Sequence, residues 1–192
     1  AEQFKKVGNI IRAEESRRYV IPSAPGKRFS DDVKVTDMLY KCYGAAVKGK
    51  KFTDSLKDIQ ERYNEIIEGL GLTLSLEKEF EIIRDNFAKK AGRDYAASRG
   101  EYLNGIIMAN YLGYVFIDAA EVIFFDEEGK FDTDKTNEIL SERLNKAERA
   151  VIPGFYGSLP DGTIKTFSRG GSDVTGSIVA KAAKVDLYEN WT

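Results

Sequence analysis

Hydrophobic residues recur at helical spacing through the first half of the chain. Phe4, Val7 and Ile10 share one face of an expected amphipathic helix, and a β-rich run at residues 19–21 follows it. Between about residue 33 and residue 97 the helical period continues in two further sets of apolar positions, namely Leu56, Ile59, Tyr63, Ile66, Ile67 and Leu70, and then Leu76, Phe80, Ile83 and Phe87. The pattern predicts a long helical excursion, at about residues 41–97, between strands.

Strand-like and helix-like segments alternate after this excursion. A third helix is expected to follow Ser98. The pattern then predicts strands at residues 113–118, 122–125, 150–155 and 185–191, and helices at residues 133–149 and 172–184. Pro160-Asp161-Gly162 predicts the tip of a hairpin over residues 156–168, since proline fixes φ and glycine allows positive φ. Such alternation is typical of a largely parallel sheet covered by helices on both faces.

Length and charge narrow the possible functions. The 192 residues are expected to form one domain, and 29 Lys and Arg against 31 Asp and Glu leave a net charge of -2, which disfavours nucleic acid as a partner. The longest apolar run, at residues 112–125, is interrupted by Asp118 and Glu121 and is too short and too charged to span a bilayer. With no apolar signal segment at its start, the chain is expected to be cytoplasmic, with no membrane partner.

Two features of the composition exclude common catalytic sites. The chain has no histidine, which excludes Ser-His-Asp triads, Cys-His dyads and zinc hydrolase sites. Its single cysteine, Cys42, excludes an intrachain disulfide and a cysteine-built metal site. The P-loop pattern and the protein-kinase signature set are absent from the sequence as well. Catalysis must therefore use carboxylates, Lys, Arg, hydroxyls and backbone amides, and no side chain is assigned to a metal.

The most informative segment is Arg169-Gly170-Gly171-Ser172-Asp173, which precedes an expected helix. The glycines let the backbone approach a ligand, the helix start attracts an anion, and Arg169 suits a carboxylate or a phosphate. Asp173 would repel a bare anion, which favours a zwitterion or a metal-bound phosphate. The alternative is a structural turn, with Ser172 as N-cap and Asp173 as an acid favoured by the helix dipole.

The segment Ser98-Arg99-Gly100-Glu101 also allows two interpretations. As a capping box, Ser98 would begin a helix and Glu101 would bond back to the cap, although Gly100 adds no helix propensity. As a binding element, Glu101 at a helix start would face a pocket and bind an ammonium group.

Three further positions follow expected strands or begin a helix. Ser23 comes after the strand at residues 19–21, where open α/β sheets bind ligands, and an ordinary turn is its alternative. Thr36 and Asp37 are expected to begin a helix as cap residues. Phe155 follows another strand, and core packing is its alternative role.

In their order and residue identity, these segments resemble the catalytic domain of the aspartokinases, within the amino acid kinase family. The matching motifs run from about residue 20 to residue 192, and they are S-A-x-G at Ser23-Ala24-Pro25-Gly26, T-D at Thr36-Asp37, S-x-G-E at 98–101, G-F-x-G at 154–157, R-G-G-S-D-x-T at 169–175 and W-T at Trp191-Thr192. Each motif is weak alone, so their common order carries the resemblance.

The resemblance implies a three-layer α/β/α sandwich with a largely parallel central sheet, incomplete and with a helical insertion, in which residues 1–192 form part of the catalytic domain. It implies ATP-dependent phosphorylation of the β-carboxylate of L-aspartate, with ATP and Mg²⁺ as cofactors and a homodimer or higher oligomer of the full-length protein. The family's K-F-G-G strand, the rest of its nucleotide-binding half and its ACT regulatory domains would lie outside this chain. The 192 residues alone are therefore expected to be inactive.

The family's functional residues map onto matching positions. By resemblance, Arg169 would hold the α-carboxylate of aspartate, Glu101 its ammonium, and Asp173 would contact the ammonium or organise the charged centre. Positions lining the substrate would be Ser23, Thr36, Phe155 and Ser172, and positions toward the nucleotide would be Gly170, Gly171 and Thr192. The chain departs from the family pattern at Asn104, where members often have Ser, and at Gly176, where Ala is usual.

Two rival functions stay open on the sequence. A sister kinase of the same fold would act on acetylglutamate, glutamate or a nucleoside monophosphate, and Glu101 discriminates because acylated and nucleotide acceptors have no ammonium. A non-catalytic ligand-binding module would have kept the fold without the activity. The presence of Arg169, Asp173 and Glu101 together argues against that module.

Overall fold

Three short parallel strands form the centre of the fold, and the computed structural model describes residues 1–168 and 171–191. The strands are β1 (Tyr19–Val20), β2 (Val115–Phe116) and β3 (Ala150–Val151), in the order β1-β3-β2. Tyr19 and Val115 each pair with Ala150 of the central strand, and both pairings are parallel. The prediction of an α/β fold with a parallel sheet is confirmed.

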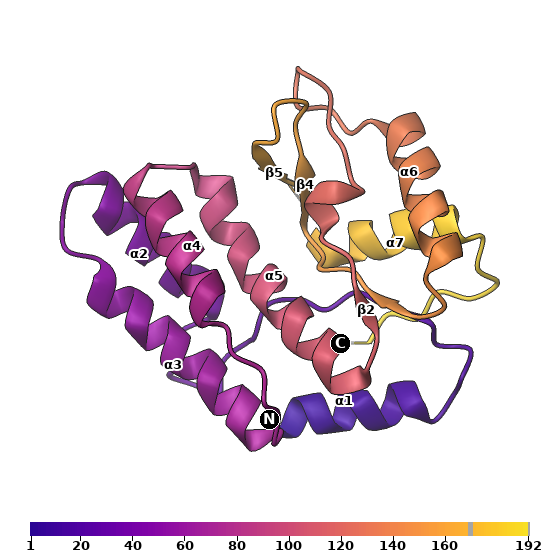
Figure 1. Cartoon of the computed structure of the whole chain (residues 1–192), viewed down its shortest axis with the longest axis horizontal. Coiled ribbons are helices and arrows are strands. Elements are labelled where there is room, and N and C mark those ends of the chain that lie inside the picture. The colour runs from indigo at the N-terminus through magenta and orange to yellow at the C-terminus, as the bar shows by residue number, and fades with distance from the viewer. Residues whose placement is uncertain (169–170, 192) are drawn as a thin grey trace.

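Helices surround this sheet (Figure 1). Within the described residues they are α1 (Glu2–Arg12), α2 (Val35–Val47), α3 (Thr53–Gly69), α4 (Glu77–Ala88), α5 (Arg93–Leu112), the 3-10 helix η1 (Ala119–Glu121), α6 (Thr133–Lys146) and α7 (Gly171–Ala183). Helices α2 to α5 gather at the left of Figure 1, and α6 and α7 lie at the right. In this described part of the chain, no helix combines the length and the apolar character that a membrane crossing requires.

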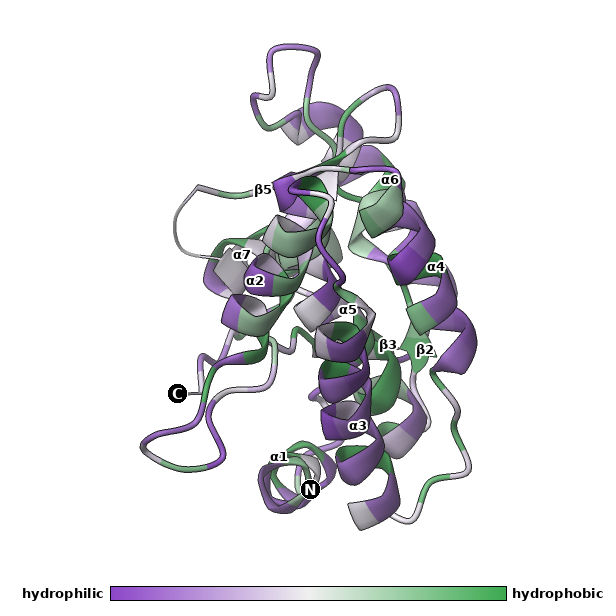
Figure 2. Cartoon of the chain, turned by 90° about the vertical axis from the view of Figure 1, so that its left-hand side faces the viewer, coloured by the Kyte–Doolittle hydropathy of each residue, from purple (hydrophilic) through white to green (hydrophobic). Residues whose placement is uncertain are grey.

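The strand side chains divide the core into two parts, because successive residues of a strand face opposite sides of the sheet. Val20, Phe116 and Val151 pack into the core that α2 to α5 build on one face. Tyr19 and Ala150 pack into the core that α6 and α7 build on the other face. Helices α3 and α4 turn polar residues outward, as the hydropathy colours of Figure 2 show. The sheet thus lies between two helical layers.

An antiparallel hairpin follows β3. Strand β4 (Tyr156–Ser158) pairs with β5 (Ile164–Thr166), so the predicted hairpin is confirmed. At its tip Gly162 has φ +84°, which glycine adopts without strain. The Asp161 side chain accepts a hydrogen bond from the Thr163 N–H at 2.8 Å, as turn aspartates commonly do. The turn residues therefore have the roles that the sequence predicted.

Gly157 lets β4 lie directly against the chain at Ile123. A Cβ at position 157 would lie 2.7 Å from the Ile123 Cγ2 and would clash with the Ile123 carbonyl oxygen. The Ser158 N–H donates a hydrogen bond to that carbonyl at 2.9 Å. The prediction of a strand at residues 122–125 is wrong, because this segment makes only isolated bridges, through Phe124 and Phe125.

The helix predicted to follow Ser98 begins earlier than expected. Helix α5 begins at Arg93 and continues as a single 20-residue helix. It therefore takes in the last residues of the predicted excursion, and Ser98 lies inside the helix rather than at its start.

The predicted strand at residues 185–191 is wrong as well. In the described part of the chain no strand pairs with this segment, and a strand needs a neighbour for its N–H and C=O groups. Leu187 and Trp191 are 73% and 61% exposed. A side-chain ion pair between Glu189 and Arg17, at 2.6 Å, connects the segment to the rest of the protein instead.

We expect Gly157→Ala to lower the free energy of unfolding by about 2 kcal/mol or more, because the new methyl group has no room beside the Ile123 backbone. Gly44→Ala in α2 is the matched control. Nothing lies within 4 Å of a Cβ at position 44, so stability should stay unchanged or rise by up to about 1 kcal/mol. Urea unfolding compares the two variants, and equal midpoints would contradict the close packing at Gly157.

Candidate functional site

The loop after β1 and the residues after β3 leave the sheet at the same edge. The two strands are parallel, and open α/β sheets bind ligands at the edge where their strands end. The pairing extends beyond the strands, since the Gly154 N–H donates to the Pro22 carbonyl at 3.4 Å. Ser23 and Phe155 each follow by one residue and so continue from this same edge of the sheet.

Ser23 and Ser172 connect this loop to the first turn of α7. Their hydroxyl oxygens lie 2.8 Å apart in a hydrogen bond. Ser172 also lies against Gly154, where a Cβ would come within 2.6 Å of the Ser172 Cβ, so only glycine permits this approach. The structure thus brings together two of the predicted substrate-lining residues.

Glu101 lies beside the loop, in the interior of α5, and is 7% exposed. Its Oε1 accepts a hydrogen bond from the Ala24 N–H at 3.1 Å, and its buried Oε2 has no partner among the residues that the structure describes. Burial raises the pKa of Glu101 from 4.5 to about 7, although the hydrogen bond from Ala24 acts in the opposite direction. The capping-box interpretation is wrong, because α5 begins at Arg93 and Glu101 bonds to the loop.

Gly100 lets α5 approach both this loop and α2. A Cβ at position 100 would lie 2.9 Å from the Ala24 Cβ and 3.7 Å from the Thr36 Oγ1. Thr36 lies inside the first turn of α2 rather than capping it, since the cap position is Lys34. Packing therefore explains the glycine before Glu101, and the same packing brings Thr36 to the helix turn that carries the carboxylate.

Phe155 has a backbone conformation that few non-glycine residues adopt, with φ at 84°. Its N–H donates a hydrogen bond to the Thr175 Oγ1 at 3.0 Å, and its carbonyl accepts one from the Phe167 N–H at 2.9 Å. The ring lies near the start of α7, where a Cβ at Gly171 would be 3.5 Å from the Phe155 Cδ2. Backbone strain concentrates at binding sites, which favours the functional interpretation of Phe155 over core packing alone.

A cleft of about 1350 Å³ lies beside the loop after β1, and Thr36, Glu101 and Phe155 are not among the residues that line it. Ser23, Asn104, Ser172 and Asp173 line it, together with residues of α1, β1 and the segment 185–191. Asp173 is exposed in the first turn of α7, and its Oδ1 accepts a hydrogen bond from the Asn190 Nδ2 at 3.2 Å. Hydroxyl, amide and carboxylate groups from three separate segments thus share one cleft.

Three predicted functional residues, Arg169, Gly170 and Thr192, lie outside the residues that the structure describes, so their roles stay predictions. Within residues 1–168 and 171–191 no group of three or more acidic or cysteine side chains is placed to hold a metal ion.

Asn104 is a residue of the site that the sequence prediction missed. It follows Glu101 by one turn of α5 and is 6% exposed. Its Nδ2 donates a hydrogen bond to the Ser23 carbonyl at 2.6 Å, and its buried Oδ1 has no partner in the described part of the chain. The three-residue spacing could have revealed it, because residues i and i+3 share one face of a helix.

Arg99, between Ser98 and Gly100, is buried and contacts aromatic rings. Its guanidinium carbon lies 4.2 Å from the ring centroid of Tyr102 and 4.7 Å from that of Tyr95, which are cation–π distances. Its positive charge lowers the pKa of Glu101 and so partly offsets the effect of burial. Arg99 therefore acts on the site through Glu101 and through packing.

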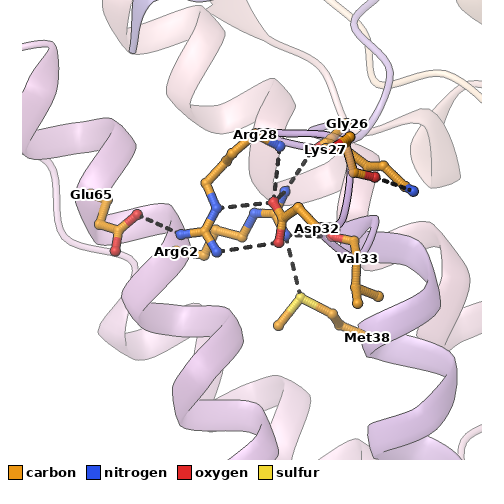
Figure 3. A network of polar contacts seen from close by, with 9 residues as sticks. Gly26, Lys27, Arg28, Asp32, Val33, Met38, Arg62 and Glu65 are labelled. Carbon is orange, nitrogen blue, oxygen red and sulfur yellow. Dashed lines mark hydrogen bonds and ion pairs between the residues drawn. The ribbon is translucent and has the colours of Figure 1, made fainter.

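Arg62 of α3 holds the loop between β1 and α2 (Figure 3). It is 4% exposed, and its guanidinium donates hydrogen bonds to the carbonyl oxygens of Gly26 and Val33. It also forms an ion pair with Asp32 at 3.0 Å. Hydrogen bonds from Arg28 are the main reason that the pKa of Asp32 lies below its usual range. The helical excursion thus fixes the loop that leads from the sheet edge to α2.

The sequence matches proteins of a known family. The model of the amino acid kinase family matches residues 1–192. Aspartokinase 3 of Bacillus subtilis (strain 168) is 35% identical over 208 residues, which cover 99% of this chain and 45% of that protein. Aspartokinase 2 of the same organism is 37% identical over 60 residues, which cover 31% of this chain and 15% of that protein.

Solved structures of aspartokinases share the fold. The aspartate kinase of Clostridium acetobutylicum is 53% identical, with a TM-score of 0.96 that covers 100% of this chain and 44% of the other. Aspartokinase III of E. coli, in complex with lysine and aspartate, is 21% identical with a TM-score of 0.71, over 95% of this chain and 44% of the other, and shows similarity of fold alone. The chain spans less than half the length of these relatives.

We expect Arg62→Met to lower the free energy of unfolding by about 2 kcal/mol, because it removes charge-assisted hydrogen bonds to the carbonyl oxygens of Gly26 and Val33 and the ion pair with Asp32. Arg84→Met is the control, since Arg84 pairs with Asp85 on the surface and its side chain is 51% exposed. That change should cost less than about 0.5 kcal/mol. Urea unfolding measures both, and a small effect of Arg62→Met would show that the loop is not held in this way.

The raised pKa of Glu101 predicts how stability depends on pH. In the unfolded chain Glu101 loses its proton above a pKa of 4.5, whereas in the folded protein it keeps the proton up to about pH 7. Its contribution to the free energy of unfolding therefore falls as pH rises from 4.5 to about 7. Its full extent is about 3 kcal/mol. We expect Glu101→Gln to remove this decline, whereas Glu81→Gln, at an exposed position of α4, should keep it. Unfolding measured across this pH range checks the prediction, and parallel curves for the protein and Glu101→Gln would contradict it.

Proposed function

Because the chain belongs to the amino acid kinase family, we propose that the protein transfers the γ-phosphoryl group of ATP to the β-carboxylate of L-aspartate, giving aspartyl phosphate. The 53% identity to the aspartate kinase of Clostridium acetobutylicum over this whole chain supports the choice of substrate. Since the chain spans 44% of that enzyme, the proposal concerns the full-length protein. The reaction would be the first step toward lysine, threonine and methionine, in the cytoplasm and in a homodimer or larger assembly.

One observation supports a substrate with a free ammonium group. Glu101 is buried, and its Oε2 has no partner among the described residues. A buried carboxylate is costly to ionise unless a cation and hydrogen-bond donors accompany it. The α-ammonium of an amino acid supplies both, and the adjoining cleft is open to a ligand of that size.

A carboxylate acceptor suits a chain without histidine. The β-carboxylate of aspartate is already ionised near neutral pH, so phosphoryl transfer to it needs no general base. Catalysis then depends on alignment and on neutralising charge. We assign the alignment of aspartate to four residues around the loop and the start of α7, which are Ser23, Thr36, Phe155 and Ser172.

The start of α7 would receive the anionic groups. Its exposed N–H groups and positive dipole end favour phosphate or carboxylate oxygens. Arg169 would bind the α-carboxylate of aspartate, and Asp173 would contact the ammonium or organise the charged centre. Gly170, Gly171 and Thr192 would lie toward ATP, whose phosphates would carry Mg²⁺.

The substrate is tested by phosphoryl transfer to a panel of acceptors. Purified full-length protein is assayed for ADP release and for trapping of acyl phosphate by hydroxylamine, with L-aspartate, L-glutamate or N-acetyl-L-glutamate. We expect turnover with L-aspartate and none with the N-acetylated acceptor, which has no ammonium, and we expect the 192-residue chain alone to be inactive. Turnover with N-acetyl-L-glutamate would support a sister kinase, and ATP-independent binding without turnover would support a non-catalytic module.

We expect Glu101→Gln in the full-length protein to raise the KM for L-aspartate about tenfold or more, because it removes a charge-assisted contact to the ammonium worth about 1.5–3 kcal/mol. The KM for ATP should change little, since Glu101 faces the amino acid. Glu81→Gln, on the exposed side of α4, serves as the control. Steady-state kinetics measures both constants, and an unchanged KM for aspartate would remove Glu101 from the substrate site.

A further inference from the structure

We infer that Asn104 binds the substrate together with Glu101, its side-chain carbonyl accepting a hydrogen bond from the α-ammonium of the amino acid. The inference rests on the proposed function, because it gives that substrate a second contact. It starts from two buried oxygens, Glu101 Oε2 and Asn104 Oδ1, which have no partner among the described residues.

The orientation of the Asn104 amide follows from its contact with the loop. The Ser23 carbonyl can only accept a hydrogen bond, so the NH₂ group of Asn104 must point toward it, at 2.6 Å. The Oδ1 atom is then turned away from that carbonyl and is left as an acceptor. Buried acceptors without donors are uncommon in folded proteins, so each one calls for an explanation, and a bound ligand is one.

The two oxygens belong to one small region. Glu101 and Asn104 are neighbours on the same face of α5, and they bond to consecutive residues, Ala24 and Ser23. An ammonium group carries three N–H donors and no acceptor, which suits two oxygens from one helix face, one of which can carry a negative charge. When Glu101 is ionised, a carboxylate or a phosphate would find no donor at these two atoms.

Asn104 also lies at the cleft, next to other residues assigned to the substrate. It lines the cleft with Ser23, Ser172 and Asp173, while Glu101 lies behind Ala24. Both oxygens are buried, so an ammonium group bound to them would be shielded from bulk water. Asn104 would thus contact the loop through its Nδ2 atom and the ammonium through its Oδ1 atom.

The test compares two ligands that differ only in the ammonium. L-Aspartate and succinate share both carboxylates, and succinate has a methylene where aspartate carries its ammonium. Their affinities are measured by calorimetry for the full-length protein, for Asn104→Ala and for Asn104→Ser. Asn110→Ala is the matched control, because Asn110 is exposed near the end of the same helix.

We expect Asn104→Ala to weaken aspartate binding about tenfold and succinate binding less than about threefold, so that the preference for aspartate falls. Asn104→Ser should shift the preference in the same direction, since a short hydroxyl cannot reach both the Ser23 carbonyl and the ammonium. This second variant decides the matter if the alanine variant does not fold. Asn110→Ala should leave both affinities unchanged.

Other outcomes overturn the inference in distinguishable ways. If the Asn104 variants lose equal affinity for aspartate and for succinate, Asn104 only positions the loop at Ser23. If neither affinity changes, the Oδ1 atom of Asn104 binds water rather than the ligand. In both cases the unmodified protein still binds aspartate, and the proposed function stands. If the unmodified protein does not bind aspartate, the proposed function fails and this inference fails with it.

Discussion

The burial of one carboxylate in the interior of a helix is the constraint on which the site depends. Glu101 lies where an apolar residue would pack without cost, and its burial outweighs the opposing effects of the Ala24 N–H and Arg99, so that its pKa rises to about 7. The Ala24 N–H donates to one of its oxygens, and the other oxygen has no partner among the described residues. A cation beside Glu101 would favour its ionised form, which supports the proposal of a substrate with a free ammonium.

The helices of the helical excursion hold the loop that contacts Glu101. The N–H of Ala24 must be held in place, yet the loop that carries it has no regular secondary structure. Arg62 of α3 fixes that loop through the carbonyls of Gly26 and Val33. Gly100 allows α5 to approach the loop from the other side. Helices that contribute few residues to the cleft thereby determine the geometry of the site.

Local sequence patterns predicted most of the helices and the hairpin, because a 3.6-residue apolar period and a Pro-Asp-Gly turn act through neighbouring residues. The strand predictions at residues 122–125 and 185–191 were wrong, because a strand needs a neighbouring strand to pair its N–H and C=O groups. That neighbour lies far away in the sequence, so no local pattern can reveal it. Glu101 was predicted as a ligand residue by resemblance, but both interpretations of its segment placed it at a helix start, whereas α5 begins at Arg93. Weak propensities do not fix that boundary. Asn104 was noted from the sequence only as a departure from the family pattern, because its contact with the Ser23 carbonyl forms only in the fold.

The most direct test of the central claim is the number of protons exchanged when L-aspartate binds. Calorimetry at about pH 6, in buffers of different ionisation enthalpy, gives this number for the full-length protein. A Glu101 that is largely protonated when free and ionised when paired with the ammonium should release about 0.9 proton per aspartate bound. Binding without proton release, or with the same release in a protein that has glutamine at this position, would contradict the account.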